Sequence, residues 1–253
     1  MLNKLESMND KYDELLLFEK KDIDINNDWI ERLQELVSIS EVIFHIGADS
    51  NTMNYDVNEM LFYNYYFSKV LFDFVGDSNK KVIYSSSAAC YGKNGLPENI
   101  YGWSKYLAEQ YGSSKVKNFI GLRYFNVYGP GEDKKGKMSS IAFQALTDSS
   151  KTFKLFPGQP KRDFVYIEDV VDANISSMHP DTPTGIFDVG SGVQSEFEEI
   201  MYFINREFEY LSKSSIPKNY QFSTLADKKK FLPSWYPKYN LEDGLVAYKK
   251  DLQ

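Results

Sequence analysis

The first half of the chain alternates short apolar runs with longer amphipathic segments. Strand-length apolar runs occupy residues 41–46, 81–84 and 119–123. Apolar spacing typical of helices occupies residues 28–39, 58–75 and 99–112. Strand–helix alternation at this spacing predicts a parallel, doubly wound α/β sheet.

The second half changes character after Gly129-Pro130-Gly131, where glycine and proline interrupt the alternation. Ser195 followed three residues later by Glu198 is typical of a capping box that opens a helix to about residue 208. The other predicted elements are helices over 138–148 and 167–178, a strand over 185–190 and a final helix from about Leu241. We expect a small C-terminal α+β lobe beside the sheet.

This pattern predicts a division of labour along the chain. We expect residues 1–130, with contributions from about 163–190, to form a Rossmann-like region for a nicotinamide cofactor. We expect residues 131–253 to form mainly a substrate-binding lobe.

Composition narrows the class of protein. The 253 residues are 42% hydrophobic and include one cysteine, Cys90, so no internal disulfide can form. The histidines, His45 and His179, are far apart, which argues against a zinc site, and no metal is expected. A net charge of −7 argues against nucleic-acid binding. No apolar run reaches membrane-spanning length, so we expect a soluble cytoplasmic protein without a membrane partner.

Tyr101 and Lys105 are the residues with the most suggestive spacing. At positions i and i+4 they share one face of the helix predicted over 99–112. A free phenol has a pKa of about 10, and a nearby ammonium group favours the phenolate. The spacing therefore predicts a base whose pKa the lysine lowers. The plain alternative is a solvated helix face in a chain with 19 tyrosines.

Small residues from Ser85 to Ala89 follow the strand predicted over 81–84. Ligands of open α/β sheets bind at the carboxyl ends of strands, where small side chains permit close approach. A serine hydroxyl there could bind a substrate oxygen while Tyr101 moves its proton. The alternative is a serine-rich turn that caps the next element.

Several strings, taken in order, resemble the extended short-chain dehydrogenase/reductase family, the NAD-dependent epimerases and dehydratases that modify nucleotide sugars. Lys135-Gly136-Lys137-Met138-Ser139-Ser140 further resembles the branch that epimerises ADP-glycero-manno-heptose at C6, although Lys137 and Gln144 stand where that branch usually has Ser and His. Ala88 and Ala89 after Ser87 favour an epimerase over a dehydratase. The family-level strings are residues 44–48, 84–92, 122–130 and 161–166.

The resemblance implies roles for individual residues. Tyr101 matches the family's catalytic tyrosine, Ser87 its hydroxyl partner and Lys105 the lysine that holds the cofactor ribose. Lys135 matches a second acid/base residue, for which a surface lysine is the alternative. The implied reaction is epimerisation of a nucleotide sugar, with oxidation and re-reduction by bound NADP or NAD.

The resemblance also implies ligand contacts. Arg162 suits a substrate diphosphate through bidentate hydrogen bonds, and an ion pair with Asp163 is the alternative. The implied cofactor contacts are Asp22, Ile23, Ala48, Ser50, Asn64, Lys105, Val127 and Lys135. The implied substrate contacts are Asn126, Lys137, Gln144, Phe156, Gly158, Gln159, Arg162 and Tyr220.

The family opens with a strand, a glycine-rich turn and a helix that seat the cofactor pyrophosphate. In this chain the only glycines before residue 92 are Gly47 and Gly76. We expect a sheet that lacks its first strand–helix unit, which exposes apolar surface and favours a homo-oligomer. The unit could be encoded upstream or supplied by another chain. Alternatively, the protein is a non-catalytic relic that binds a nucleotide sugar or a partner.

Overall fold

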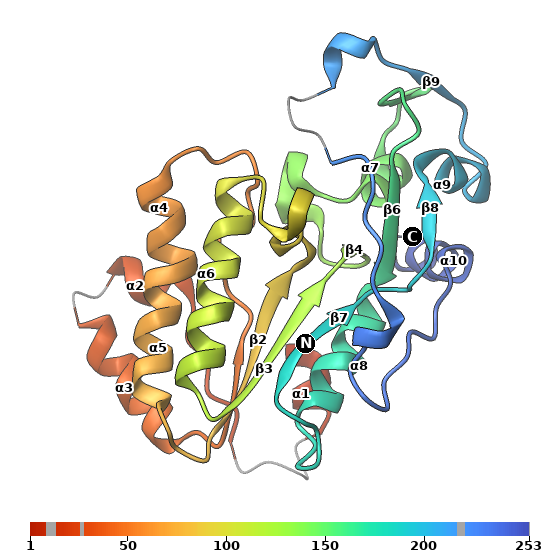
Figure 1. Ribbon diagram of the computed structural model, residues 1–253. Coiled ribbons are helices and arrows are strands. Elements are labelled where there is room, and N and C mark those ends of the chain that lie inside the picture. The colour runs from red at the N-terminus through yellow and green to blue at the C-terminus, as the bar shows by residue number, and fades with distance from the viewer. Residues whose placement is uncertain (9–13, 26–27, 217–220, 253) are drawn as a thin grey trace. The chain divides into compact units, whose positions relative to one another are not determined.

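The computed structural model describes residues 1–8, 14–25, 28–216 and 221–252 (Figure 1). The chain forms two compact units that interleave in sequence. The first comprises Met1–Leu122 and Ser177–Ile186, and the second comprises Arg123–Ser176 and Phe187–Gln253.

A four-stranded sheet organises the first unit, with the strand order β1-β2-β3-β7. β1 and β2 run parallel, with Val42 opposite Lys81 and His45 opposite Tyr84. β2 extends beyond the predicted run and ends at Ser87, so the strand itself delivers this serine to its carboxyl end. The strands are β1 (Val42–His45), β2 (Lys81–Ser87), β3 (Asn118–Tyr124) and β7 (Gly185–Val189).

Helices α3, α5 and α6 lie side by side in Figure 1 and form a layer against this sheet. The predicted helix over 58–75 is confirmed, but it contains a π-helical turn, Phe62–Tyr66, between α4 and α5. The helices of this unit are α1 (Leu2–Glu6), α2 (Lys20–Ile25), α3 (Trp29–Ile39), α4 (Val57–Leu61), α5 (Phe67–Val75) and α6 (Ile100–Lys115), with 3₁₀ turns at Ala88–Cys90 and Lys93–Gly95.

Aromatic side chains fill the space between helices and sheet. Phe72 of α5 packs edge-on against Tyr84 of β2 and Phe119 of β3, with ring centroids 5.8 and 5.6 Å away. Gly112 of α6 lies so close to Phe119 that an added Cβ would approach its ring to 2.3 Å. This tight helix–sheet contact is typical of a Rossmann-like α/β fold, which confirms the predicted fold class.

The second unit combines small sheets with four helices of its own. β4 pairs parallel with β6, and β6 pairs antiparallel with β8. The strands are β4 (Asn126–Tyr128), β5 (Phe153–Leu155), β6 (Lys161–Tyr166), β8 (Gln194–Glu196) and β9 (Phe208–Tyr210). The helices are α7 (Ile141–Thr147), α8 (Ile167–Ser177, whose last residue belongs to the first unit), α9 (Phe197–Phe203) and α10 (Leu241–Asp251), with 3₁₀ turns at Asp133–Met138, Lys213–Ser215 and Lys228–Lys230.

The predicted helix from Ser195 to about residue 208 is wrong at both ends. Ser195 lies in β8, opposite Arg162, and Glu196 is the N-cap of α9. The capping box joins Glu196 to Glu199, whose carboxylate accepts a hydrogen bond from the Glu196 backbone at 2.8 Å. The helix ends at Phe203 because the following segment forms β9.

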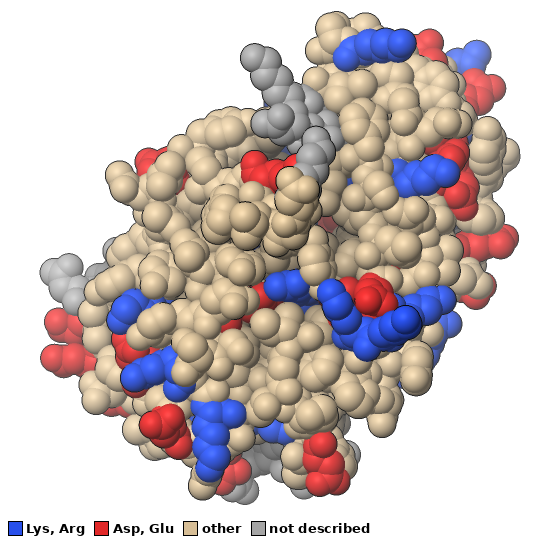
Figure 2. Space-filling model, in the orientation of Figure 1, with Lys and Arg blue, Asp and Glu red and all other residues tan. Residues whose placement is uncertain are grey.

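Charged side chains of both signs are interspersed on the face drawn in Figure 2, without one continuous basic field. This distribution agrees with the net charge of −7. Among the described residues, no helix is both long and apolar enough to cross a membrane.

Candidate active site

The carboxyl end of β2 meets the N-terminus of α6 in the first unit. Ser87 accepts a hydrogen bond from the Ala89 backbone at 3.1 Å and so caps the turn after the strand. Asn99 caps α6 by accepting from the Gly102 backbone at 2.7 Å, which fixes Tyr101 in the first helical turn. A Cβ at Gly102 would lie 2.4 Å from the Ala89 carbonyl oxygen, so only glycine permits this approach.

Ser87 and Tyr101 are brought together, as the sequence predicts. Burial raises the pKa of Tyr101 to about 12, and the hydrogen bond with Ser87 lowers it in part. Lys105 contributes nothing to this shift, whose further causes are Cys90 and Asp49. The prediction that the lysine lowers the tyrosine pKa is therefore wrong for this structure, because desolvation dominates.

Lys105 is buried, with only 2% of its surface exposed. Its Nζ lies 4.3 Å from the ring centroid of Tyr84, a distance at which an ammonium is attracted to an aromatic face. Burial lowers the pKa of Lys105 to about 8, while Cys90 and Glu109 act in the opposite direction. The side chain is therefore charged at neutral pH and loses its proton under mildly alkaline conditions.

Asn64 lies in the π-helical turn and is buried. Its Oδ1 accepts from the Asp49 backbone N–H at 2.7 Å, and its Nδ2 donates to the Asp49 carbonyl at 2.9 Å. This pair of bonds holds the loop after β1, where the predicted cofactor contacts Ala48 and Ser50 are exposed. The loop therefore offers an ordered backbone and accessible side chains to a ligand.

The same asparagine reaches the catalytic helix. Its Nδ2 lies 3.0 Å from Ser104 Oγ, which donates to the Tyr101 carbonyl at 2.7 Å. Asn64 thus joins the loop after β1 to the turn of α6 that carries Tyr101 and Lys105.

Asp22 and Ile23 lie in α2, in contacts that stabilise the fold. Asp22 accepts from the Glu19 backbone at 2.7 Å and forms an ion pair with Arg32 at 3.0 Å. Ile23 packs against the core of helices and sheet. Their role in cofactor binding stays a prediction.

In the second unit, Lys135 and Lys137 are exposed on the 3₁₀ turn Asp133–Met138. Glu132 fixes this segment because its buried carboxylate accepts from Gly129 N at 3.0 Å and from both the backbone N (2.5 Å) and the Oγ (2.9 Å) of Ser140. Gln144 donates from Nε2 to the Ser139 carbonyl at 2.8 Å. Lys135, Lys137 and Gln144 therefore belong to one loop region.

Three other predicted contacts surround residues 221–224. Arg162 donates to the Gln221 carbonyl, and Asn126 accepts from Thr224 Oγ1 at 2.9 Å. Phe222 lies against Gly158, where an added Cβ would sit 3.0 Å from its ring. The remaining predicted residues are Val127 in β4, half-buried Phe156, and Gln159, exposed with a φ of +50°. Tyr220 lies outside the described residues.

Asp163 is fully buried, and its carboxylate binds the backbone N–H groups of Ser191, Gly192 and Ala226 at 2.6 to 3.0 Å. It also accepts from the Ser191 hydroxyl at 2.8 Å. Both oxygens are thus committed to two loops, so anchoring those loops, rather than pairing with Arg162, is the role that the structure gives Asp163.

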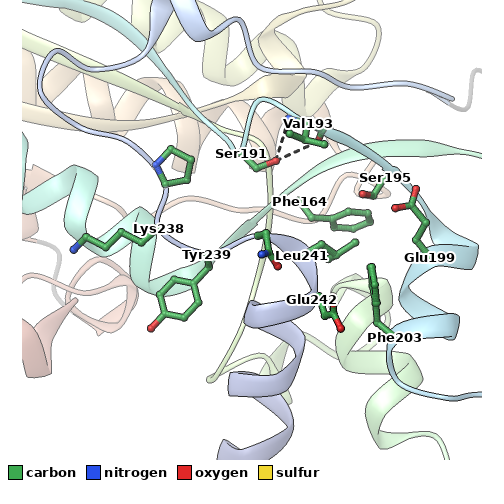
Figure 3. Close-up of a pocket in the computed structure, with 12 residues that line it drawn as sticks. Phe164, Ser191, Val193, Ser195, Glu199, Phe203, Lys238, Tyr239, Leu241 and Glu242 are labelled. Atoms are coloured by element: carbon green, nitrogen blue, oxygen red, sulfur yellow. Dashed lines mark hydrogen bonds between the residues drawn. The ribbon is translucent and has the colours of Figure 1, made fainter.

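A cavity of about 450 Å³ opens in the second unit beside the N-terminus of α10 (Figure 3). None of the predicted site residues lines it. Its lining comprises Phe164, Ser191, Val193, Ser195, Glu199, Phe203 and residues 237–242.

Sequence reasoning missed the buried carboxylates Glu109, Glu132 and Asp163. Glu109 had a usable signal, because it continues the i, i+4 series of Tyr101 and Lys105. Glu132 and Asp163 act through backbone groups distant in sequence, which leave no local pattern. Among the described residues, no group of three or more His, Cys, Asp or Glu side chains is placed to hold a metal ion.

A serine–tyrosine hydrogen bond and a lysine one turn further along the same helix, at the end of a parallel strand, define the class of short-chain dehydrogenase/reductase-type enzymes. A family model described as the NAD dependent epimerase/dehydratase family matches residues 3–190. The chain belongs to this family, and by class it is an NAD(P)-dependent sugar epimerase.

Individual relatives agree. The chain is 34% identical over 241 residues to an ADP-L-glycero-D-manno-heptose-6-epimerase of Brachyspira hyodysenteriae, covering 84% of this chain and 76% of the relative. It resembles the solved ADP-L-glycero-D-manno-heptose-6-epimerase of Helicobacter pylori with a TM-score of 0.76, 31% identity, and coverage of 90% of this chain and 76% of that one. A UDP-N-acetylglucosamine 4-epimerase of Methanobrevibacter ruminantium in complex with UDP-N-acetylmuramic acid gives 0.77 at 26% identity, covering 92% and 81%.

Proposed function

We propose that this protein epimerises ADP-glycero-manno-heptose at C6. The hydrogen bond between Ser87 and Tyr101 carries the catalytic part of the proposal, because it places a proton-transferring phenol at the sheet edge where ligands of this fold bind. The similarity to two ADP-heptose epimerases supports the choice of sugar.

The donor set of the first unit fits a nicotinamide cofactor. The buried Lys105 ammonium suits the hydroxyls of a ribose, and the loop held by Asn64 exposes Ala48 and Ser50 to a ligand. When bound, NAD(P) accepts a hydride from a sugar carbon and returns it. We favour NADP, with NAD as the alternative.

Proton transfer falls to this chain's own side chains. As the hydride leaves the sugar carbon, the hydroxyl proton on that carbon moves to a base, and a carbonyl forms. The reverse step returns a proton to the oxygen. With a pKa raised to about 12, Tyr101 holds its proton at neutral pH and is suited to donating it during reduction. We assign Lys135, exposed on its own loop, as the second acid/base group.

Substrate binding falls to the second unit. Arg162, Asn126 and Gly158 meet around residues 221–224, which gives the substrate lobe a guanidinium and an amide close to one segment. We assign Arg162 to the substrate diphosphate, with further contacts from Phe156, Gln159, Tyr220, Lys137 and Gln144.

The experiment incubates the purified protein with NADP or NAD and one nucleotide sugar at a time, and follows the sugar configuration by proton NMR. Inversion at C6 of ADP-heptose supports the proposal. Inversion of UDP-N-acetylglucosamine at C4 instead would support the second candidate, another nucleotide-sugar epimerase, which the similarity to the Methanobrevibacter enzyme favours. Binding without turnover would indicate a non-catalytic relic.

We also propose that the chain forms a homo-oligomer. Trp103 and Leu107, one turn apart on α6, are each 39% exposed, which leaves apolar area for a second copy. Light scattering after gel filtration tests this, and a monomer at micromolar concentration would contradict it.

A further inference from the structure

α6 buries a carboxylate beside the catalytic residues. Glu109 is fully buried and follows Lys105 by one helical turn and Tyr101 by two. Its Oε2 accepts a hydrogen bond from Ser86 Oγ at 2.6 Å, and Gln110 Nε2 lies 3.3 Å from its Oε1. A buried carboxylate is costly unless it is hydrogen-bonded and its charge is balanced, so its position calls for an explanation.

The bond to Ser86 joins two elements of the site. Ser86 immediately precedes Ser87 at the end of β2, whereas Glu109 lies on the helix that carries Tyr101 and Lys105. Ser86 Oγ also lies 3.4 Å from the Cys90 sulfur in the turn that follows the strand. The carboxylate therefore fixes the register between the strand end and the helix, on which the meeting of Ser87 and Tyr101 depends.

Charge gives Glu109 a second effect. The titratable groups that act with or against Lys105 are Tyr84 of β2, Cys90 of the following turn, His45 of β1 and Glu109. A thiol and a phenol ionise at about pH 8.5 and 10, and His45 is neutral because burial lowers its pKa to about 3. Of these groups, the carboxylate is the one that carries negative charge at neutral pH.

We propose that Glu109 is a positioning residue for the Ser87, Tyr101 and Lys105 set. It holds the end of β2 against α6 through Ser86, and its charge keeps Lys105 in the ammonium form. The inference deepens the proposed function and rests on it.

The test compares Glu109→Gln with wild type over a range of pH, with kcat and kcat/KM measured separately. The expected result is a fall in kcat of about tenfold or more and a shift of the alkaline limb of kcat/KM downward by about one pH unit. The shift arises because Lys105 then loses its proton at lower pH. A purely structural role would lower activity equally at all pH values.

Two variants serve as controls. Glu109→Asp retains the charge with a shorter side chain, so kcat falls while the alkaline limb stays near its wild-type position. Glu31→Gln removes the same charge from an exposed site on α3 and changes neither quantity. Circular dichroism verifies that each variant is folded.

A measurement independent of turnover separates this inference from the proposed function. Titration of the Lys105 side-chain nitrogen by ¹⁵N NMR, assigned through loss of the signal in Lys105→Arg, should give a lower midpoint in Glu109→Gln and an unchanged midpoint in Glu31→Gln. A wild type without turnover contradicts the proposed function alone. Equal Lys105 midpoints in wild type, Glu109→Asp and Glu109→Gln overturn the role of Glu109.

Discussion

The side-chain amide of Asn64 pairs with the backbone of Asp49 in both directions, accepting from its N–H and donating to its carbonyl. One side chain thus satisfies both backbone groups of a loop residue, as a neighbouring strand would do. The π-helical turn that carries Asn64 interrupts the regular helix at this point, which is a common location for functional residues.

Asn64→Asp retains the acceptor oxygen but removes the donor to Asp49 and Ser104. We expect the free energy of unfolding to fall by about 1–3 kcal/mol, because a buried carbonyl loses its partner, and the Kd for NADP to rise. Thermal unfolding and fluorescence titration measure the two effects. Asn58→Asp, exposed on α4, is the matched control, and a variant at Asn64 that behaves like this control contradicts the role.

The hydroxyl of Ser68 determines the tautomer of His45. It donates its single hydrogen to the Asn64 carbonyl at 2.6 Å, so it can only accept from His45 Nε2 at 2.7 Å. His45 therefore carries its proton on Nε2 and is neutral. Burial, and secondarily the charge of Lys105, lowers its pKa to about 3.

This histidine predicts an acid-dependent loss of stability. Its folded pKa lies below its unfolded pKa of about 6.5, so the unfolded state binds a proton that the folded state refuses, and stability falls as the pH drops from 6.5 toward 3. Each pKa unit corresponds to about 1.4 kcal/mol at most. His45→Gln should show a flatter dependence of unfolding free energy on pH. The exposed His179→Gln should follow wild type, and identical curves for both variants would refute the assignment.

Glu132 predicts the order of the loop that carries Lys135. Glu132→Ala leaves the N–H groups of Gly129 and Ser140 without their acceptor, at a cost of about 1–3 kcal/mol for each group that stays dry. We expect a lower melting temperature and faster trypsin cleavage at the exposed lysines of this loop. Asp133→Ala, an exposed neighbour, should leave cleavage unchanged; equal cleavage rates in the two variants count against the clamp.

Local patterns were sufficient for most elements of the fold. Periodicity predicted α3 and the long helix through α5 nearly to the residue, because apolar spacing directly reflects burial. Residues 195–208 were misassigned because the pairing of Ser195 with Arg162 is a contact between distant segments that competes with the local capping signal. The π-helical turn at 62–66 also leaves no trace in hydrophobic spacing.

The candidate site was predictable in membership but not in electrostatics. Ser87 and Tyr101 meet as their spacing and the family resemblance imply. The sign of the tyrosine pKa shift could not be read from an i, i+4 spacing, because it depends on burial and on Lys105 lying over Tyr84. The anchoring role of Asp163 depends on loops 28 or more residues away in sequence.

The central claim is that the Tyr101 phenol transfers the proton that accompanies hydride transfer at the sugar carbon. The most direct measurement is the rate of C6 inversion of ADP-heptose, followed by NMR with NADP present, in wild type, Tyr101→Phe and the control Tyr106→Phe on the same helix. We predict inversion by wild type and Tyr106→Phe, and a rate lower by about 10²-fold or more in Tyr101→Phe with unchanged folding and substrate binding. Inversion by Tyr101→Phe at the wild-type rate would contradict the account.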